Sequence, residues 1–238
     1  MNDQRRHAML TTALALLVAH LLADYPLRNS WIIANKKKLA AMAAHIGVVF
    51  LLSLLALRGE ILPALTIAAL HLGIDLIKTH LAPATLWAYV VDQLAHAATI
   101  LGILWFWPAL GMLWPEATLF VQYLLTITAG LILCVFAGGP AIGLLMKDFA
   151  VVMQNSLPEA GKMIGQLERA VIFLLVIAGY PAGVGFLIAA KSILRFDKDP
   201  KASEYVIIGT LASFGWALLV SFATLSLITF YGMDPTPS

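Results

Sequence analysis

The sequence predicts an all-α, polytopic membrane helix bundle with about seven transmembrane helices and a tandem helical-hairpin repeat in its first half. Of its 238 residues, 61% are hydrophobic and only 12% are charged, and the mean hydropathy is +0.90. No single soluble core could bury so much apolar surface, so the lipid bilayer is the expected partner. The 15 basic and 13 acidic residues form no basic domain, which argues against nucleic acid as a partner.

Four spans are expected in the first half. Residues 8–25 read as a retained helix rather than a cleaved signal peptide, because such a signal rarely holds a His and an Asp in its apolar part. This helix ends at Pro26, and the polar segment after it, with Trp31 and the lysines 36–38, is typical of an interfacial connection. Further spans are expected at 39–57, 61–79 and 83–107. The short connection from Thr79 to Pro83 predicts an antiparallel hairpin.

Three more spans are expected in the second half, at 117–136, 170–190 and 205–230. The Gly138-Gly139-Pro140 run is expected to break the chain, and residues 141–154 are too few for a crossing of about 20 residues. We therefore predict an interfacial or re-entrant segment near 138–155, and a kink around 179–181. We therefore expect two parts in the chain. Residues 1–110 form a duplicated four-helix half that carries the candidate site, and residues 111–238 form a C-terminal membrane half.

The most specific signal is a pattern that recurs after 51 residues. His20, Asp24 and His45 return as His71, Asp75 and His96, with His-x3-Asp-x20-His spacing in both copies. A spacing of four places two side chains on one helix face, and Asp92 and His96 show the same spacing in reverse order. Because the hairpins are antiparallel, all these groups are expected on one side of the membrane, one to two turns below the interface.

Imidazole and carboxylate groups from facing helices are suitable ligands for Zn, Fe or Mn. We predict a site for one or two divalent ions. Its predicted ligands are His20, Asp24, His45, His71, Asp75, Asp92 and His96.

The predicted function is metal-dependent hydrolysis of a lipid or a lipid-linked anionic substrate. Asp92 is the candidate general base, and Arg28, Lys78 and His80 are the candidate contacts to an anionic headgroup. The sequence contains no HExxH, GxSxG or Walker motif, which argues against zincin-type proteases, nucleophile-elbow hydrolases and P-loop ATPases.

Other interpretations of the polar residues stay open. The cluster of His and Asp side chains also suits a small proton- or ion-coupled transporter. It equally suits a polar network that only specifies packing in a non-catalytic assembly partner. Asp24 lies four residues before Arg28, and Asp75 three before Lys78, so each carboxylate is also placed to pair along its own helix. Glu168 and Arg169 are expected to form a juxtamembrane ion pair. The lone Cys134 excludes an intrachain disulfide.

Several motifs extend over most of the chain: HLLADYPL, WIIANK, HLGIDLIK, VDQLAH, QLERAVIFLLVIAGYPAGVGFLIAAKSILRF and EYVIIGTLASFG. They resemble an uncharacterised bacterial integral-membrane family of unknown function, in which the first motif usually continues with Gln at the position of Arg28. The resemblance implies a multi-pass protein of the bacterial inner membrane. The first half is also loosely similar to membrane-bound metal-dependent hydrolase-like proteins through its intramembrane His and Asp motifs.

Overall fold

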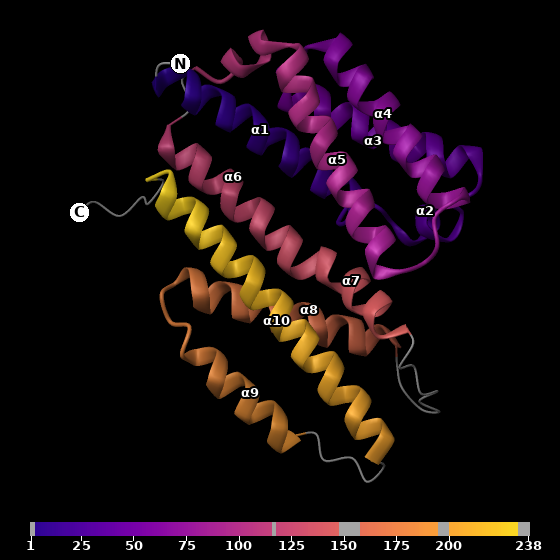
Figure 1. Cartoon of the computed structure of the whole chain (residues 1–238), viewed down its shortest axis with the longest axis vertical. Coiled ribbons are helices and arrows are strands. Elements are labelled where there is room, and N and C mark those ends of the chain that lie inside the picture. Colours follow the sequence, from indigo (N-terminus) through magenta and orange to yellow (C-terminus); the bar gives the residue numbers. More distant parts are fainter. Residues whose placement is uncertain (1–2, 116–117, 148–157, 195–199, 233–238) are drawn as a thin grey trace. The chain divides into compact units, whose positions relative to one another are not determined.

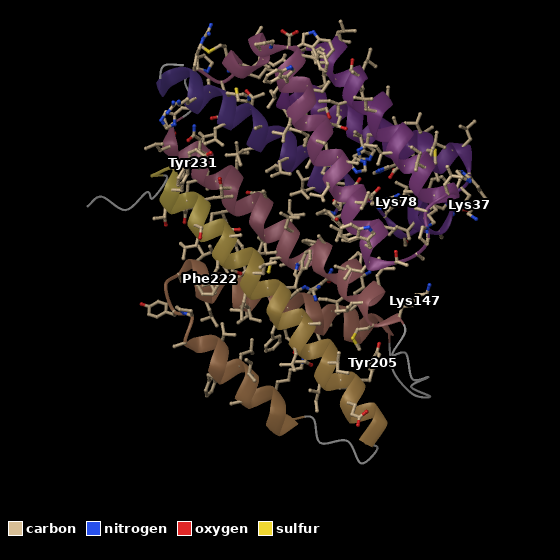
Figure 2. The ribbon with its side chains drawn as sticks, in the orientation of Figure 1. Lys37, Lys78, Lys147, Tyr205, Phe222 and Tyr231 are labelled. Carbon is tan, nitrogen blue, oxygen red and sulfur yellow. The ribbon has the colours of Figure 1, made fainter. Side chains whose placement is uncertain are left out.

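The computed structural model describes residues 3–115, 118–147, 158–194 and 200–232, and all regular secondary structure in these ranges is helical (Figure 1). Within these ranges, six helices are long and apolar enough to cross a membrane, close to the predicted number of about seven. Large apolar side chains remain exposed along these helices, among them Leu101, Trp105 and Phe222, the last labelled in Figure 2. The prediction of an all-helical, multi-pass membrane protein is confirmed.

The chain forms two compact units, Met1–Ala129 with Tyr231–Ser238, and Gly130–Phe230. Residues 1–110, the predicted duplicated half, all fall in the first unit. Its four long helices are α1 (Asp3–Asp24), α3 (Leu39–Ala56), α4 (Ile61–His80) and α5 (Leu86–Phe106). Helix α1 packs against α3 and α5, and α4 also packs against both of these helices. The four helices therefore enclose a common interior.

Small and aliphatic side chains fill most of that interior. Ala15, Ala19, Val49, Ala64 and Ile100 belong to one buried cluster, and such side chains allow the helices to approach closely. A short helix, α2 (Ser30–Ala34), interrupts the connection between α1 and α3. Its first turn is capped by the Asn29 side chain, which accepts a hydrogen bond from the Ile32 N–H at 2.9 Å. Beyond α5, the 3-10 helix η1 (Pro108–Met112) packs on α1.

The helix that follows differs from the expectation at the Gly138-Gly139-Pro140 run. Helix α6 (Leu119–Ile132) passes into a π-helical segment, η2 (Leu133–Ala137), and then into α7 (Gly138–Leu145), so one apolar helix extends over Leu119–Leu145. The chain does not break at Pro140, because the wider π turn accommodates a residue that lacks an N–H. Residues 148–155 of the predicted interfacial segment lie outside the described residues.

In the second unit, α8 (Pro158–Ile177) packs along α10 (Pro200–Phe230), and α9 (Gly183–Leu194) packs against α8. The predicted span 170–190 is thus divided between the end of α8 and most of α9. Gly179 has a φ of 81°, a conformation that glycine adopts without strain. The Tyr180 N–H then reaches back to the Leu175 carbonyl at 2.8 Å. This hydrogen bond ends α8 in a Schellman motif. The chain therefore has a helix terminus at the position where a kink within one helix was predicted.

Candidate metal centre

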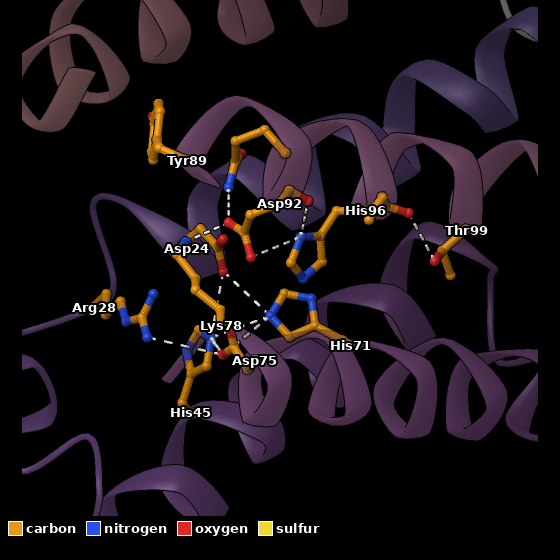
Figure 3. Close-up of polar contacts among 12 residues, drawn as sticks. Asp24, Arg28, His45, His71, Asp75, Lys78, Tyr89, Asp92, His96 and Thr99 are labelled. Carbon is orange, nitrogen blue, oxygen red and sulfur yellow. Dashed lines mark hydrogen bonds and ion pairs between the residues drawn. The ribbon is translucent and has the colours of Figure 1, made fainter. Parts of the chain in front are cut away.

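The seven predicted ligands lie in the interior of the four-helix bundle. His20 and Asp24 come from α1, His45 from α3, His71 and Asp75 from α4, and Asp92 and His96 from α5. Six of them are buried, with exposed fractions of 6% or less, and His20 is partly buried. The structure therefore brings together every residue of the predicted set, and Figure 3 labels all of them except His20.

The centre lies at a different depth on the two hairpins. Asp24 is the last residue of α1, and His45 follows the start of α3 by about 9 Å along the axis. On the second hairpin, His71 precedes the end of α4 by about 13 Å, and His96 follows the start of α5 by about 15 Å. Asp75 and Asp92 lie about 8 and 9 Å from these same helix ends, so α4 and α5 each carry ligands at two levels along their axes.

Four of the ligand atoms lie close together, with short separations in five of their six pairings. The Nε2 atoms of His45 and His71 are 3.2 Å apart, and Asp24 Oδ1 lies 3.3 Å from each of them. Asp75 Oδ2 lies 3.3 Å from His45 Nε2 and 3.7 Å from His71 Nε2. Ligands bound about 2.0–2.1 Å from a tetrahedral zinc ion are about 3.3–3.4 Å from one another. These five separations are close to that spacing. Asp24, His45 and His71 form one group whose ligand atoms all lie within 4.8 Å of one another, and Asp75 adjoins this group through its contacts to the two imidazoles.

Hydrogen bonding alone does not satisfy these four atoms. When two neutral imidazoles face each other through their Nε2 atoms, only one of these nitrogens can donate an N–H to the other. A carboxylate has no N–H to donate. Asp24 Oδ1 has no hydrogen bond of acceptable geometry within the described residues, although two ring nitrogens lie close to it. Buried polar atoms without partners are costly. A divalent cation among the four atoms would satisfy them together, so the donor set fits a metal ion.

A second group of ligands adjoins the first. Asp75, Asp92 and His96 offer ligand atoms that lie within 4.8 Å of one another, and so do His20, His71 and His96. The Nδ1–H of His96 donates to the Asp92 carbonyl at 2.8 Å, which leaves the lone pair of the neutral ring on Nε2. That Nε2, Asp75 Oδ1 and Asp92 Oδ1 are buried without hydrogen-bond partners in the described part of the chain. This group is looser, but its chemistry also suits a cation.

The cationic residues pair across helices rather than along them. Arg28 Nη2 lies 3.8 Å from Asp75 Oδ2, and Lys78 forms an ion pair with Asp92 Oδ2, which also accepts a hydrogen bond from Gln93 Nε2 at 2.9 Å. The alternative pairs along one helix, Asp24 with Arg28 and Asp75 with Lys78, are not observed. His80 is exposed at the end of α4, so of the three predicted headgroup contacts only Arg28 and Lys78 touch the ligand residues.

A small cavity opens beside two of these ligand residues, His45 and Asp75. It is lined by Arg28 and Ile32, by Lys36, and by His45 and Asp75 among others, and its volume is about 10 Å³, close to the minimum for one water molecule. Ile32 of α2 is buried at this position, so the short helix covers the cavity. Two of the lining side chains are cationic, which makes the cavity favourable to anions.

Sequence reasoning missed a pair of tyrosines near the centre. The Tyr25 and Tyr89 hydroxyl groups hydrogen-bond to each other, and the Tyr89 ring lies 5.5 Å from Lys78 Nζ. Burial, together with the neighbouring Tyr89, raises the pKa of Tyr25 far above its usual value. Their positions in the sequence could have identified these tyrosines, because Tyr25 follows Asp24 directly and Tyr89 precedes Asp92 by three residues. Tyr25 thus remains a neutral hydrogen-bonding group.

Comparison with known proteins fits the predicted resemblance to an uncharacterised family over the first half of the chain. Residues 12–124 match a family model described as a protein of unknown function, DUF3307. The matched range contains all seven ligand residues and all three predicted headgroup contacts. No curated protein and no solved structure matches the chain.

Proposed function

We propose that the family-matched half of this chain is a membrane-embedded, metal-dependent hydrolase that acts on a lipid or lipid-linked anionic substrate, in the bacterial inner membrane. The observation that carries the proposal is the set of five separations of 3.2–3.7 Å among His45, His71, Asp24 and Asp75. Two carboxylates would balance the charge of a divalent ion held by the two imidazoles. The donor set suits Zn, Fe or Mn.

The ligand residues would hold the ion, and neighbouring residues would supply the other groups that hydrolysis needs. A bound divalent ion would act as a Lewis acid toward an ester or phosphoryl oxygen. Lys78 and Gln93 hold Asp92 Oδ2, whereas Asp92 Oδ1 has no hydrogen-bond partner within the described ranges. Asp92 lies outside the set of four close atoms. Its Oδ1 is therefore suited to accept a proton as a general base.

The charge and position of this cavity support the proposed substrate class. Arg28 and Lys36 line the cavity beside His45 and Asp75, and guanidinium and ammonium groups favour phosphate or carboxylate ligands. The helices around the centre expose apolar side chains, so an acyl or polyprenyl tail could remain in lipid while its headgroup lies against Arg28 and Lys36. We expect Arg28 and Lys78, with His80 at the helix end, to contact that headgroup.

The first test is the metal content of the purified full chain, extracted in mild detergent without chelator. We expect at least one equivalent of a divalent metal in the wild type and less than a tenth of that in His45→Ala. His80→Ala is the matched control, because it removes an exposed histidine outside the ligand set and should retain the metal. A wild type without stoichiometric metal, or a His45→Ala variant with the wild-type content, would contradict the metal site.

The hydrolase assignment is tested separately with metal-loaded protein and lipid phosphate esters or lipid carboxyl esters as substrates. Asp92→Asn should lower kcat about 100-fold or more, as loss of a general base does, without abolishing metal binding. If the loaded wild type cleaves neither class of ester, the hydrolase assignment is wrong even when the metal is present.

A proton- or ion-coupled transporter is the second candidate, and the depth of two histidines favours it. His71 and His96 lie roughly halfway along α4 and α5, and transporter sites commonly lie near the bilayer midplane between repeated units. This alternative predicts proton or ion flux into liposomes that contain the protein, and the flux should persist after metal removal. Metal-dependent ester cleavage without flux would exclude it.

A further inference from the structure

The second unit contains a buried cation that the metal centre does not use. Arg169 lies on α8 with an exposed fraction of 4%. The expected ion pair with Glu168 is not formed, because Glu168 pairs with Lys191 instead, at 2.6 Å from Nζ to Oε1. Within the described residues no carboxylate forms an ion pair with Arg169. A buried guanidinium without an acidic partner is uncommon, because buried charges are normally paired.

The π-helical segment explains how the protein stabilises this charge. Pro140 has no N–H, so the Val135 carbonyl, five residues earlier, has no partner at the position that a π turn would use. Arg169 supplies the missing donors. Its Nη2 donates to the Val135 carbonyl at 2.7 Å, and its Nε donates to the Cys134 carbonyl at 3.0 Å. The helix distortion and the buried arginine therefore stabilise each other.

Glycines form the space that the guanidinium occupies. A Cβ atom at Gly138 would lie 2.9 Å from Arg169 Nε, and a Cβ at Gly165 would lie 3.2 Å from Nη1. At Gly139 it would lie 3.7 Å from Nη2. Side chains at Gly138 and Gly165 would crowd the guanidinium. The close backbone at these glycines therefore restricts where the guanidinium can lie.

Part of the hydrogen-bonding capacity of Arg169 remains unused. A guanidinium has five N–H groups. The Nε–H and one N–H of Nη2 are directed to carbonyls, and one N–H of Nη1 donates to Ser213 Oγ at 3.2 Å. One N–H on each Nη atom is therefore left without a partner in the described part of this unit. Two such donors match a phosphate in a bidentate contact.

These donors border a large pocket within the second unit. Its volume is about 710 Å³, which is the size of a small-molecule site, and Arg169, Gly139 and Ser213 line it. The lining includes three cationic residues, Arg169, Lys162 and Lys191, but only one carboxylate, Glu168. Most of the remaining wall is apolar, with Phe136, Ile142, Met146 and Val206. The pocket thus combines an anion-binding end with hydrocarbon surface.

We propose that this pocket binds the phosphate group of an amphiphile, with Arg169 holding the phosphate oxygens and the apolar wall contacting the hydrocarbon part. The site shares no residue with the metal centre and does not depend on the proposed hydrolysis. Free inorganic phosphate offers the same headgroup chemistry without the hydrocarbon, so the two sources must be distinguished by experiment.

The test measures retention of dioleoyl phosphatidic acid by the detergent-solubilised full chain in native mass spectrometry. Phosphatidylcholine, whose headgroup carries no net charge, is the comparison lipid. We expect at least tenfold tighter binding of phosphatidic acid, because hydrogen bonds to charged groups are among the stronger ones. Arg169→Gln should abolish the preference. Gly143→Trp should reduce binding at least tenfold by filling the pocket, since Gly143 lines it and a Cβ there meets nothing within 4 Å.

Gly215→Trp is the matched control, because Gly215 is an exposed helical glycine with nothing within 4 Å of its Cβ position and does not line the pocket. This variant should bind phosphatidic acid as the wild type does. Competition by millimolar inorganic phosphate would support the anion site with soluble phosphate as its ligand, and no competition would support it with a lipid. Wild-type binding by a folded Gly143→Trp protein, or equal retention of both lipids, would overturn the proposal.

Discussion

Among the described carboxylates of the metal centre, Asp75 has the most ion-pair partners. Its Oδ2 approaches the ring nitrogens of His45 and His71 and the guanidinium of Arg28, while its Oδ1 is buried without a hydrogen-bond partner among the described residues. Asp75 is therefore placed to serve both groups of ligands. Asp92, in contrast, belongs only to the looser group.

This difference gives a prediction for two isosteric substitutions. Asp75→Asn should weaken binding of zinc by at least about 100-fold, more than the loss of an outer-shell partner would. Asp92→Asn should leave the tightest bound ion in place, because the four close atoms remain. Titration of metal-depleted protein with zinc against a chromophoric chelator measures both affinities. Equal loss of affinity in the two variants would contradict the assignment of the close set.

The ion pair between Lys78 and Asp92 leads to a second prediction. Lys78→Ala leaves a buried carboxylate without its cation, and because Lys78 is partly exposed we expect a loss of only about 1–3 kcal/mol in unfolding free energy. The double variant Lys78→Ala/Asp92→Asn should recover part of this loss. Chemical denaturation of the four proteins in the double-mutant cycle, all metal-depleted, measures the coupling. Additive effects would show that the pair contributes nothing.

At the scale of helices, the segment through η2 and α7 shows how local sequence and tertiary contacts combine. Pro140 and its preceding glycines suggested a chain break, yet the helix continues because Arg169 supplies donors to the freed carbonyls. Trp216 also donates to the Leu133 carbonyl at 3.1 Å. The stability of this helix therefore depends on side chains that are far away in the sequence.

Two glycines of α7 provide a matched pair for testing this packing. A Cβ at Gly138 would lie 2.7 Å from Trp216 and 2.9 Å from Arg169, whereas a Cβ at Gly143 would meet nothing within 4 Å. Gly138→Ala should destabilise the protein by about 1–3 kcal/mol through overpacking. Gly143→Ala should be neutral or stabilising by up to about 1 kcal/mol, because alanine favours helix. Thermal unfolding in detergent compares them, and equal effects would contradict the close packing at Gly138.

At the scale of the whole molecule, the apolar runs predicted most of the helices, and the 51-residue pattern predicted which residues meet. Residues four apart on antiparallel neighbours must converge when the helices enclose one interior, so the positions of His71 and Asp75 followed from spacing. The partners of Arg28, Lys78 and Glu168 did not follow from spacing, because ion pairs across helices depend on helix rotation and on the length of each connection. The Tyr25–Tyr89 contact and the π turn depend on tertiary packing in the same way.

The two candidate sites lie in different units and share no residue, which predicts independent responses. His45→Ala should leave phosphatidic acid binding unchanged within a factor of about two, and Gly143→Trp should leave the metal content unchanged, as substitutions without shared partners usually combine additively. Native mass spectrometry and elemental analysis of both variants measure this. A reduction of both properties by either variant would mean that the sites are coupled.

The small cavity beneath α2 has a kinetic consequence. The cavity of about 10 Å³ beside Arg28, Ile32 and His45 is too small to hold a chelator molecule. EDTA that approaches from this side would therefore reach the ion only after the short helix moves aside or the ion escapes unaided. Metal loss should then follow first-order kinetics with a half-life that does not change with EDTA concentration. Replacement of Ile32 by glycine should shorten that half-life, which would make α2 the gate for ion exchange.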